Sequence, residues 1–224
     1  MEIVISGYGR MGHMIERVLE RRNIKCIGKS EDITSFPREK AKNAVCIDFT
    51  VPDAFRNNYK WLAENFKAVV VGTTGWYDIM DEVSDCFRTA GTTMIWASNF
   101  SLGINVLDAA VELVARLVKP EDVFQPYIVE KHHIHKLDAP SGTAKTLALT
   151  VEKNLGLLPA ISSVRAGEIP GIHSVVFEGI NERLTLEHEA FNREGLAEGA
   201  VQAALLTEGL NGVHEFKSLL LKDV

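Results

Sequence analysis

The feature that most constrains the fold is a glycine-rich turn between an apolar strand and an amphipathic helix at the start of the chain. Ile3–Ser6 has the composition of a buried strand, and Gly7-Tyr8-Gly9-Arg10-Met11-Gly12 follows it directly. From Met11 to Arg22 apolar residues recur at helical spacing. In this setting the first glycine permits a tight turn, the second lets backbone approach a pyrophosphate, and the third allows close packing of helix on strand. A plain turn would use the same glycines, but the flanking strand and helix favour a phosphate site at a helix N-terminus.

The first hundred residues alternate short apolar runs with longer amphipathic stretches. We expect strands at Ile3–Ser6, Lys25–Gly28, Ala44–Phe49, Ala68–Val71 and Thr93–Ala97. We expect helices at Met11–Arg22, Pro52–Phe66 and Asp78–Ala90. Because the strands are apolar almost throughout, the pattern predicts a parallel sheet covered on both faces.

The pattern changes after residue 101. Helices are expected at Asn105–Val118, Gly142–Leu155 and Leu196–Leu210. Strands are expected at Gln125–Lys131, Ser163–Gly167, His173–Glu178, Arg183–Ala190 and, as a short last strand, Phe216–Leu221. The predicted fold class is therefore α/β. A Rossmann-type dinucleotide-binding domain spans residues 1–101, with 196–224 returning to it, and an α+β domain with an open mixed sheet spans 102–195.

Composition and charge exclude several classes of protein. The chain has 224 residues and a net charge of −6, and its basic residues form no stripe, which disfavours a nucleic-acid partner. No apolar run approaches the length of a membrane span, and no secretory signal is read at the N-terminus. The three cysteines, Cys26, Cys46 and Cys86, show no Cys-x-x-Cys spacing, so we expect reduced thiols and a cytoplasmic protein.

Three further segments fall where a dinucleotide would be bound. An acidic residue near the end of the second strand usually holds the ribose; Glu31 and Asp32 both qualify, and we choose Glu31. Lys29 and Arg10 are near enough in sequence to meet a 2′-phosphate, so the cofactor is NADH or NADPH. The remaining candidate contacts, in loops after two strands, are Gly72, Thr73, Thr74, Ala97, Ser98, Asn99 and Phe100.

The most unusual stretch runs from Glu130 to Ala144 and contains His132, His133 and His135 before a Pro-Ser-Gly-Thr turn. Clustered histidines can bind metal, but adjacent histidines on a strand point apart and no cysteine is near, so we expect no metal site. Surface histidines are a second alternative. The interpretation that we prefer is an anion site with a proton donor. Lys136 supplies a positive charge there, and the N–H groups of Ser141, Gly142 and Thr143 at a helix start suit a carboxylate.

The order of these motifs resembles the dihydrodipicolinate reductase family over nearly the whole chain. The resemblance rests on His-His-x-x-Lys-x-Asp-Ala-Pro-Ser-Gly-Thr at 132–143, the glycine loop, Asp48-Phe49-Thr50, Gly72-Thr73-Thr74-Gly75, Ala97-Ser98-Asn99-Phe100-Ser101, Gly171-Ile172-His173, His188-Glu189-Ala190 and Glu198-Gly199-Ala200.

The resemblance implies NAD(P)H-dependent reduction of 4-hydroxy-tetrahydrodipicolinate, or of dihydrodipicolinate, to tetrahydrodipicolinate on the diaminopimelate route to lysine. It implies that His132 is the general acid, that Lys136 is a second proton donor and substrate anchor, and that His133, Gly142 and Thr143 contact the carboxylates of a cyclic dicarboxylate. The cofactor contacts that it implies are the loop from Gly7 to Gly12, Glu31, Gly72–Thr74 and Ala97–Phe100. It also implies a homotetramer joined through the sheet of the second domain.

Two alternatives stay open from the residues alone. Another two-domain reductase, such as an amino-acid dehydrogenase, would share the nucleotide fold, because a fold does not determine a substrate. A nucleotide-sensing regulator would need an effector or DNA-binding module, and the chain has no basic helix-turn-helix-like segment. The chain also departs from the family in having Asp32 where a basic residue often follows the ribose-binding acid, which leaves the choice between NADH and NADPH open.

Overall fold

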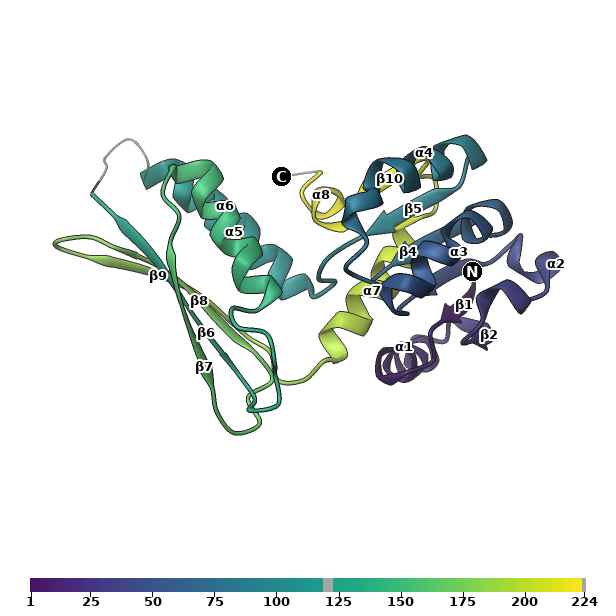
Figure 1. Ribbon diagram of the computed structural model, residues 1–224, viewed down its shortest axis with the longest axis horizontal. Helices are drawn as coiled ribbons and strands as arrows, with labels where there is room; N and C mark the ends of the chain where they lie inside the picture. The colour runs from purple at the N-terminus through teal and green to yellow at the C-terminus, as the bar shows by residue number, and fades with distance from the viewer. Residues whose placement is uncertain (119–122, 223–224) are drawn as a thin grey trace. The chain divides into compact units, whose positions relative to one another are not determined.

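A computed structural model describes residues 1–118 and 123–222. By its internal contacts the chain forms two compact units, Met1–Ser101 with Leu196–Val224, and Leu102–Gly195. Each unit has its own sheet and its own core, and Figure 1 shows both. The α/β class with a Rossmann-like sheet and a second mixed sheet is confirmed.

The first unit is built on a parallel six-stranded sheet in the order β10-β5-β4-β3-β1-β2. Its strands are β1 (Glu2–Ser6), β2 (Lys25–Ser30), β3 (Val45–Asp48), β4 (Ala68–Val71), β5 (Thr93–Trp96) and β10 (Val213–Glu215). Its helices are α1 (Arg10–Arg21), α2 (Arg38–Ala41), α3 (Pro52–Asn65), α4 (Met80–Ala90), α7 (Glu194–Leu206) and α8 (Phe216–Leu220), with short 3-10 turns at Ile33–Ser35 and Tyr77–Ile79. Because all strands run in parallel, every loop that follows a strand opens at the same edge of the sheet.

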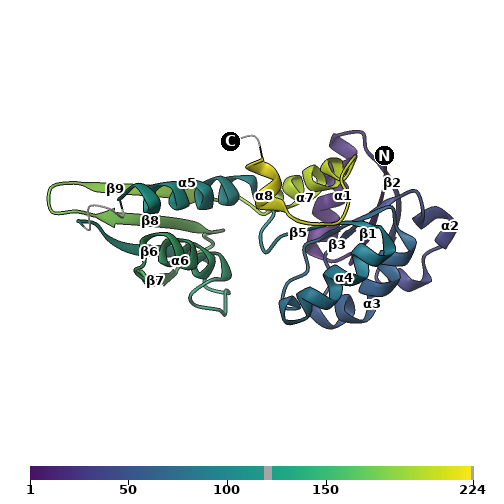
Figure 2. The same cartoon turned by 90° about the horizontal axis from the view of Figure 1, so that it is seen from above.

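Two apolar layers enclose this sheet, as the nearly continuous apolar strands predict. α1, α7 and α8 cover one face, and α3 and α4 cover the other (Figure 2). Ile3, Ile5 and Ile47 face the first layer, whereas Val4 and Cys46 face the second, so alternate residues of each strand are buried on opposite sides.

The second unit is a four-stranded mixed sheet with two helices on one face (Figure 1). Its elements are α5 (Leu102–Val118), β6 (Gln125–His132), α6 (Gly142–Leu155), β7 (Ala160–Arg165), β8 (Ile172–Glu178) and β9 (Arg183–Glu189). The sheet order is β7-β6-β8-β9; β7 is parallel to β6, and the other pairs are antiparallel. Val111, Leu147 and Val151 of the helices pack against Ile128 and Phe177 of the sheet.

The expected last strand at Phe216–Leu221 is wrong. That segment is the helix α8, and the strand that precedes it, Val213–Glu215, pairs in parallel with β5. The physical reason is the spacing of Phe216, Leu219 and Leu220 at i, i+3 and i+4, which puts them on one helical face against the first core. The apolar residues Val175, Phe177, Leu184 and Leu186 also predict burial of every second residue along β8 and β9. Along β8 the burial is instead continuous from His173 to Phe177.

Candidate active site

The glycine loop meets the steric demands of a nucleotide turn. Gly7 has a φ of +85°, and a Cβ there would lie 2.3 Å from the carbonyl oxygen of Phe49. A Cβ at Gly12 would lie 2.5 Å from the carbonyl oxygen of Gly7. A Cβ at Gly9 would meet nothing within 4 Å. The first and third glycines are therefore required by the fold itself, whereas Gly9 faces open space at the start of α1, where a phosphate would lie.

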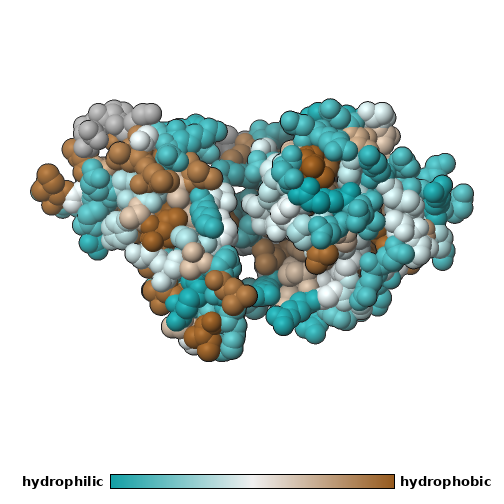
Figure 3. Space-filling model, viewed as in Figure 1, coloured by the Kyte–Doolittle hydropathy of each residue, from teal (hydrophilic) through white to brown (hydrophobic). Residues whose placement is uncertain are grey.

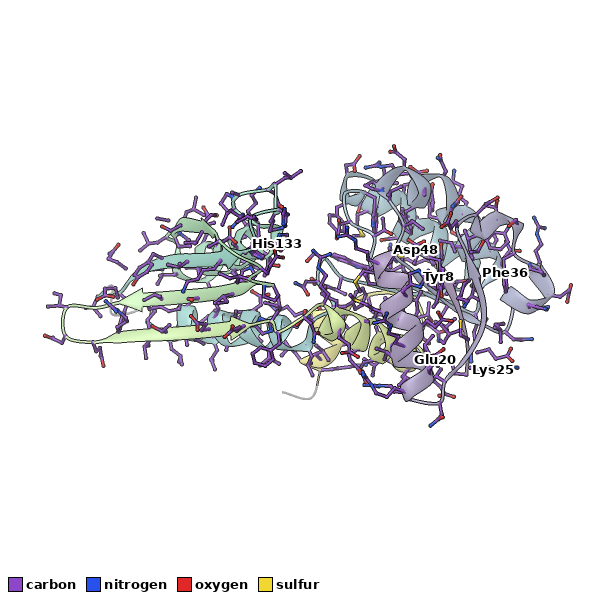
Figure 4. All side chains as sticks on the ribbon, turned by 90° about the horizontal axis from the view of Figure 1, so that it is seen from below. Tyr8, Glu20, Lys25, Phe36, Asp48 and His133 are labelled. Atoms are coloured by element: carbon purple, nitrogen blue, oxygen red, sulfur yellow. The ribbon has the colours of Figure 1, made fainter. Side chains whose placement is uncertain are left out.

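The buried carboxylate of Asp48 connects the ends of three neighbouring strands. The hydroxyls of Ser6 and Thr73 donate to it over 2.7 and 2.6 Å, and that of Thr50 donates over 3.2 Å. Burial raises the pKa of Asp48 despite these three donors. Thr73, which the sequence predicts as a cofactor contact, thus spends its hydroxyl proton on Asp48 and also accepts from the Thr50 N–H over 2.8 Å. Figure 4 labels Asp48 and Tyr8 in this unit.

The end of β2, where the sequence predicts ribose binding, carries acidic residues, and most of the charged side chains there have protein partners. Glu31 is exposed just beyond the last residue of β2. Asp32 accepts from the Thr34 N–H over 3.1 Å and so caps the following turn. Lys29 donates to Glu16 over 2.6 Å and lies 4.8 Å from the centre of the Tyr8 ring. Of the two cations that the sequence offers to a 2′-phosphate, Lys29 and Arg10, Lys29 is therefore already paired.

The two other predicted cofactor loops contribute in different ways. Thr74 and Ser98 are exposed, at the same edge of the sheet as the glycine loop. Ala97 and Phe100 are buried in the first core, where Phe100 packs against Phe216, so their side chains serve the core and only their backbone is left for the predicted cofactor contact. Asn99 accepts from the Ser101 N–H over 2.8 Å and shapes the loop.

In the second unit, β6 carries a buried acid–base pair. Glu130 and His132 lie on the same face of the strand, and one carboxylate oxygen of Glu130 is hydrogen-bonded to Nδ1 of His132. The other carboxylate oxygen accepts from Arg165 over 2.8 Å. Glu130 is fully buried and His132 is 7% exposed.

The surroundings shift both pKa values. Burial alone would raise the pKa of Glu130, but the bonds that it accepts from Arg165, Ser163 and His132 outweigh that effect and lower the pKa to about 2. Burial lowers the pKa of His132, and the positive charges of Lys136 and Arg165 act in the same direction, while Glu130 opposes them. The hydrogen bonds that Glu130 accepts thus favour its ionised form.

The start of α6 is joined to this pair. Ser141 caps the helix, its hydroxyl accepting from the Ala144 N–H over 3.2 Å, and the same hydroxyl lies 3.2 Å from Nε2 of His173. The N–H of Ser141 donates to Glu130 over 3.4 Å. The N–H of Ser141, which the sequence predicts as an anion-binding group, therefore already has a protein partner. Gly142 is exposed, and a Cβ there would meet nothing within 4 Å.

The loop between β6 and α6 holds the other predicted substrate residues. Lys136 is partly buried and donates to Asp138 over 2.7 Å. His133, labelled in Figure 4, is half-buried, and its Nδ1 is a buried atom without a hydrogen-bond partner. His135 is exposed and pairs with Glu168. Within the described residues, the structure thus brings His132, Lys136 and the start of α6 into one region of the second unit, which fits an anion site.

A metal site remains the competing interpretation of the histidines. One ligand atom each of Glu130, His132 and His173 lie within 4.8 Å of one another. However, the Arg165 guanidinium already balances the charge of Glu130, and His132 uses Nδ1 to bond the same carboxylate. A cation would have to displace both partners, so the geometry favours acid–base chemistry.

The sequence assigned no role to Glu130, Arg165 or His173, although all three line this region. Glu130 could have been found, because it lies two residues before His132 and strand residues of period two share a face. Arg165 and His173 reach the site through register: Arg165 is opposite His132 on β7, and His173 is opposite Glu130 on β8. No local pattern predicts those pairings.

Comparisons with known proteins agree over the whole chain. The family model described as dihydrodipicolinate reductase, N-terminus, matches residues 1–100, and the model of its C-terminus matches residues 103–220. A 4-hydroxy-tetrahydrodipicolinate reductase of Christiangramia forsetii is 35% identical over 98% of both chains. The enzyme of that name from Xanthomonas campestris is 44% identical over 71% of this chain and 65% of its own.

Solved structures support the fold. A dihydrodipicolinate reductase from Paenisporosarcina, solved with dipicolinate bound, matches with a TM-score of 0.80 at 20% identity and covers 98% of this chain and 99% of its own. An amine dehydrogenase from Mycobacterium smegmatis matches with a TM-score of 0.69 at 8% identity, over 97% of this chain and 95% of its own. At these identities the likeness extends to the fold alone.

Proposed function

This chain belongs to the dihydrodipicolinate reductase family, and on that premise we propose how its own residues carry out the reaction. It is an NAD(P)H-dependent oxidoreductase of the diaminopimelate route to lysine, reducing 4-hydroxy-tetrahydrodipicolinate, or the dihydrodipicolinate derived from it, to tetrahydrodipicolinate. The observation that carries the residue assignments is His132, buried and bonded to an ionised glutamate beside the exposed start of α6.

The first unit fits a nicotinamide dinucleotide. The open space at Gly9, at the start of α1, suits the pyrophosphate, and the exposed side chain of Glu31, just after β2, would hold the adenosine ribose. The loop from Gly7 to Gly12, with Gly72–Thr74 and Ala97–Phe100, would line the rest of the cofactor along the same sheet edge. When bound, the dinucleotide supplies the hydride that reduces the substrate ring.

His132 is the proposed proton donor. Reduction of an unsaturated ring by hydride leaves electron density that a proton must quench, and an imidazolium can give that proton from Nε2. Lys136 and His133 bind the carboxylates of a cyclic dicarboxylate, and Lys136 exchanges its partner Asp138 for the substrate in doing so. Gly142 and Thr143, at the N-terminus of α6, receive a substrate carboxylate, while Ser141 maintains the turn.

The assembly and compartment of the enzyme are part of the same proposal. The proposed assembly is a homotetramer joined through the sheet of the second unit. Large apolar side chains are exposed on this unit, and Figure 3 shows apolar surface there. Among them are Leu113, Leu117, Leu149, Val164, Ile180, Leu184 and Phe191.

The cysteines are free thiols, which suits the reducing cytoplasm. In the described residues, no helix is both long and apolar enough to cross a bilayer.

The direct test is turnover of the purified protein with enzymatically generated 4-hydroxy-tetrahydrodipicolinate, followed by the loss of NADH or NADPH absorbance. The expected result is substrate-dependent oxidation of the nucleotide with formation of tetrahydrodipicolinate, and competitive inhibition by a planar pyridine dicarboxylate. Nucleotide oxidation that ignores this substrate but follows an amino acid or its keto acid would instead support the amino-acid dehydrogenase alternative.

A further inference from the structure

We infer that Glu130, anchored by Arg165, is a positioning residue that fixes the ring of His132 so that Nε2 alone can deliver the proton. This inference rests on the proposed role of His132 as the acid. Glu130 touches neither substrate nor cofactor in this account, because both of its carboxylate oxygens have protein partners. It acts through His132.

The two carboxylate oxygens of Glu130 have different partners. One oxygen bonds Nδ1 of His132, and the other accepts from Arg165 over 2.8 Å and from the Ser141 N–H over 3.4 Å. The Arg165 guanidinium also donates to the carbonyl oxygen of Asp138 over 2.6 Å, so it joins β7 to the loop before α6. With one oxygen held in this way, the carboxylate cannot rotate away from His132, and the Nδ1–H of the ring has a fixed acceptor.

Position 171 leaves the other ring nitrogen clear of a side chain. A Cβ at Gly171 would lie 3.2 Å from Nε2 of His132, so the glycine at this position keeps side-chain atoms away from that nitrogen. When Nε2–H breaks, its proton passes to the reduced substrate and the neutral ring keeps Nδ1–H toward Glu130. Water then returns the proton to Nε2. Glu130 stays ionised throughout, as in other acid–base pairs in which a carboxylate orients a histidine.

The charges around His132 explain why a carboxylate is needed there. Lys136 in the following loop, Arg165 on β7 and His173 on β8 all face this region, and the cationic groups disfavour an imidazolium. Burial also lowers the pKa of His132, and Glu130 is the group that opposes the shift. Removing the charge of Glu130 should therefore lower the pKa further, so that the protonated acid is lost at a lower pH.

The experiment compares Glu130→Gln, His132→Gln and the double variant by steady-state kinetics across pH, with the wild type. Glu130→Gln should lower kcat about 10- to 100-fold, less than loss of the acid itself, with KM nearly unchanged. Its high-pH limb in kcat/KM should move to lower pH. In the His132→Gln background, Glu130→Gln should change kcat less than about 2-fold, because a residue that acts through His132 has nothing left to position. Glu178→Gln removes another arginine-paired carboxylate of the same sheet and should leave kcat and the pH profile unchanged.

A wild-type kcat and pH profile for Glu130→Gln would overturn the inference. A double variant whose loss in kcat equals the product of the two single losses would overturn it as well. If Glu130→Gln does not fold, ¹⁵N NMR of the histidine rings in the wild-type protein decides instead. Neutral His132 should carry its proton on Nδ1, and a proton on Nε2 would contradict the inference. If His132→Gln keeps the wild-type rate, it is the proposed role of His132 that fails, whatever the tautomer.

Discussion

At the scale of single residues, the glycine loop shows that a glycine can be required either by the fold or by a ligand. Gly7 and Gly12 are required because a Cβ at either would approach a backbone carbonyl to 2.3 or 2.5 Å. Gly9 has no such neighbour. Of the three glycines in this loop, Gly9 is thus the one without a steric reason in the fold, so it is the position at which cofactor binding and folding can be separated.

Gly9→Val should weaken binding of NADH at least about 10-fold, or about 1.4 kcal/mol, because the new side chain fills the space proposed for the pyrophosphate. The thermal unfolding midpoint of the cofactor-free protein should stay near that of the wild type, since no atom lies within 4 Å of the added Cβ. Fluorescence titration with NADH measures the affinity. An unchanged affinity in a folded variant would remove the cofactor from this loop.

His173 predicts a pH dependence of stability. Burial lowers its pKa from 6.5 to about 4, with a smaller contribution from His132 in the same direction. The unfolded chain therefore binds a proton near pH 6.5, whereas the folded chain does not bind it until about pH 4. Stability from this group is complete above pH 6.5 and is lost as the pH falls toward 4.

The loss attributable to His173 should reach about 3 kcal/mol at most, the equivalent of the shift in pKa. Urea unfolding of the wild type and of His173→Gln above and below this window measures it. The variant should lose less free energy of unfolding on acidification than the wild type. Equal losses in the two proteins would show that His173 does not carry this proton.

At the scale of elements, sequence patterns were most informative where one periodicity dominates. The five parallel strands β1 to β5 and the helix α6 lie where the apolar patterns predict them. The pattern predicts a strand where α8 forms, because five residues show the i, i+3 and i+4 spacing only once, which is too little to distinguish a helix from a short apolar strand. Its neighbour β10 has only three residues and pairs at the edge of the sheet with β5, which is far away in the sequence.

The difference between local patterns and contacts distant in sequence also explains which active-site residues could be predicted. His132, Lys136 and the Ser141 turn lie within one contiguous stretch, so their residue types alone suggested an anion and a proton donor. Arg165 and His173 enter only through the register of β7 and β8 with β6. The engagement of Lys29 by Glu16 likewise depends on side-chain packing that no spacing rule gives.

The helix α8 gives a prediction at this scale. Phe216 is fully buried and packs against Phe100, with ring centres 5.2 Å apart. Phe216→Ala should lower the free energy of unfolding by about 3–5 kcal/mol, through lost burial and the cavity left behind. Leu221→Ala, at a 37%-exposed position just after the same helix, should cost less than about 1 kcal/mol. Similar costs for the two variants in denaturant unfolding would mean that α8 does not close the first core.

At the scale of the whole molecule, the chain consists of two units with different tasks in the proposed reaction. The first is discontinuous, because α7, β10 and α8 return to it after the second unit is complete. The residues proposed for the cofactor all belong to the first unit, and those proposed for the substrate all belong to the second. Exposed apolar side chains such as Leu117 and Phe191 on the second unit are surface that the proposed assembly would cover.

Light scattering during size-exclusion chromatography tests that assembly. We expect a particle of four times the 24.8-kDa chain at micromolar concentration. A lysine on the exposed apolar surface, as in Leu184→Lys on β9, should shift the mass toward smaller species because a charge would have to be buried in the interface. A stable monomer of the wild type would contradict the proposed homotetramer and leave the reductase activity to be explained by single chains.

The central claim is that His132 provides the proton in the reduction, and the kinetics of His132→Gln beside the wild type test it most directly. The account predicts a loss of about 10²- to 10⁴-fold in kcat with KM little changed, because the acid acts in the transition state rather than in substrate binding. It also predicts that the high-pH limb of the wild-type kcat profile, where His132 loses its proton, disappears in the variant. Equal turnover by both proteins, with the same limb in both profiles, would contradict the claim.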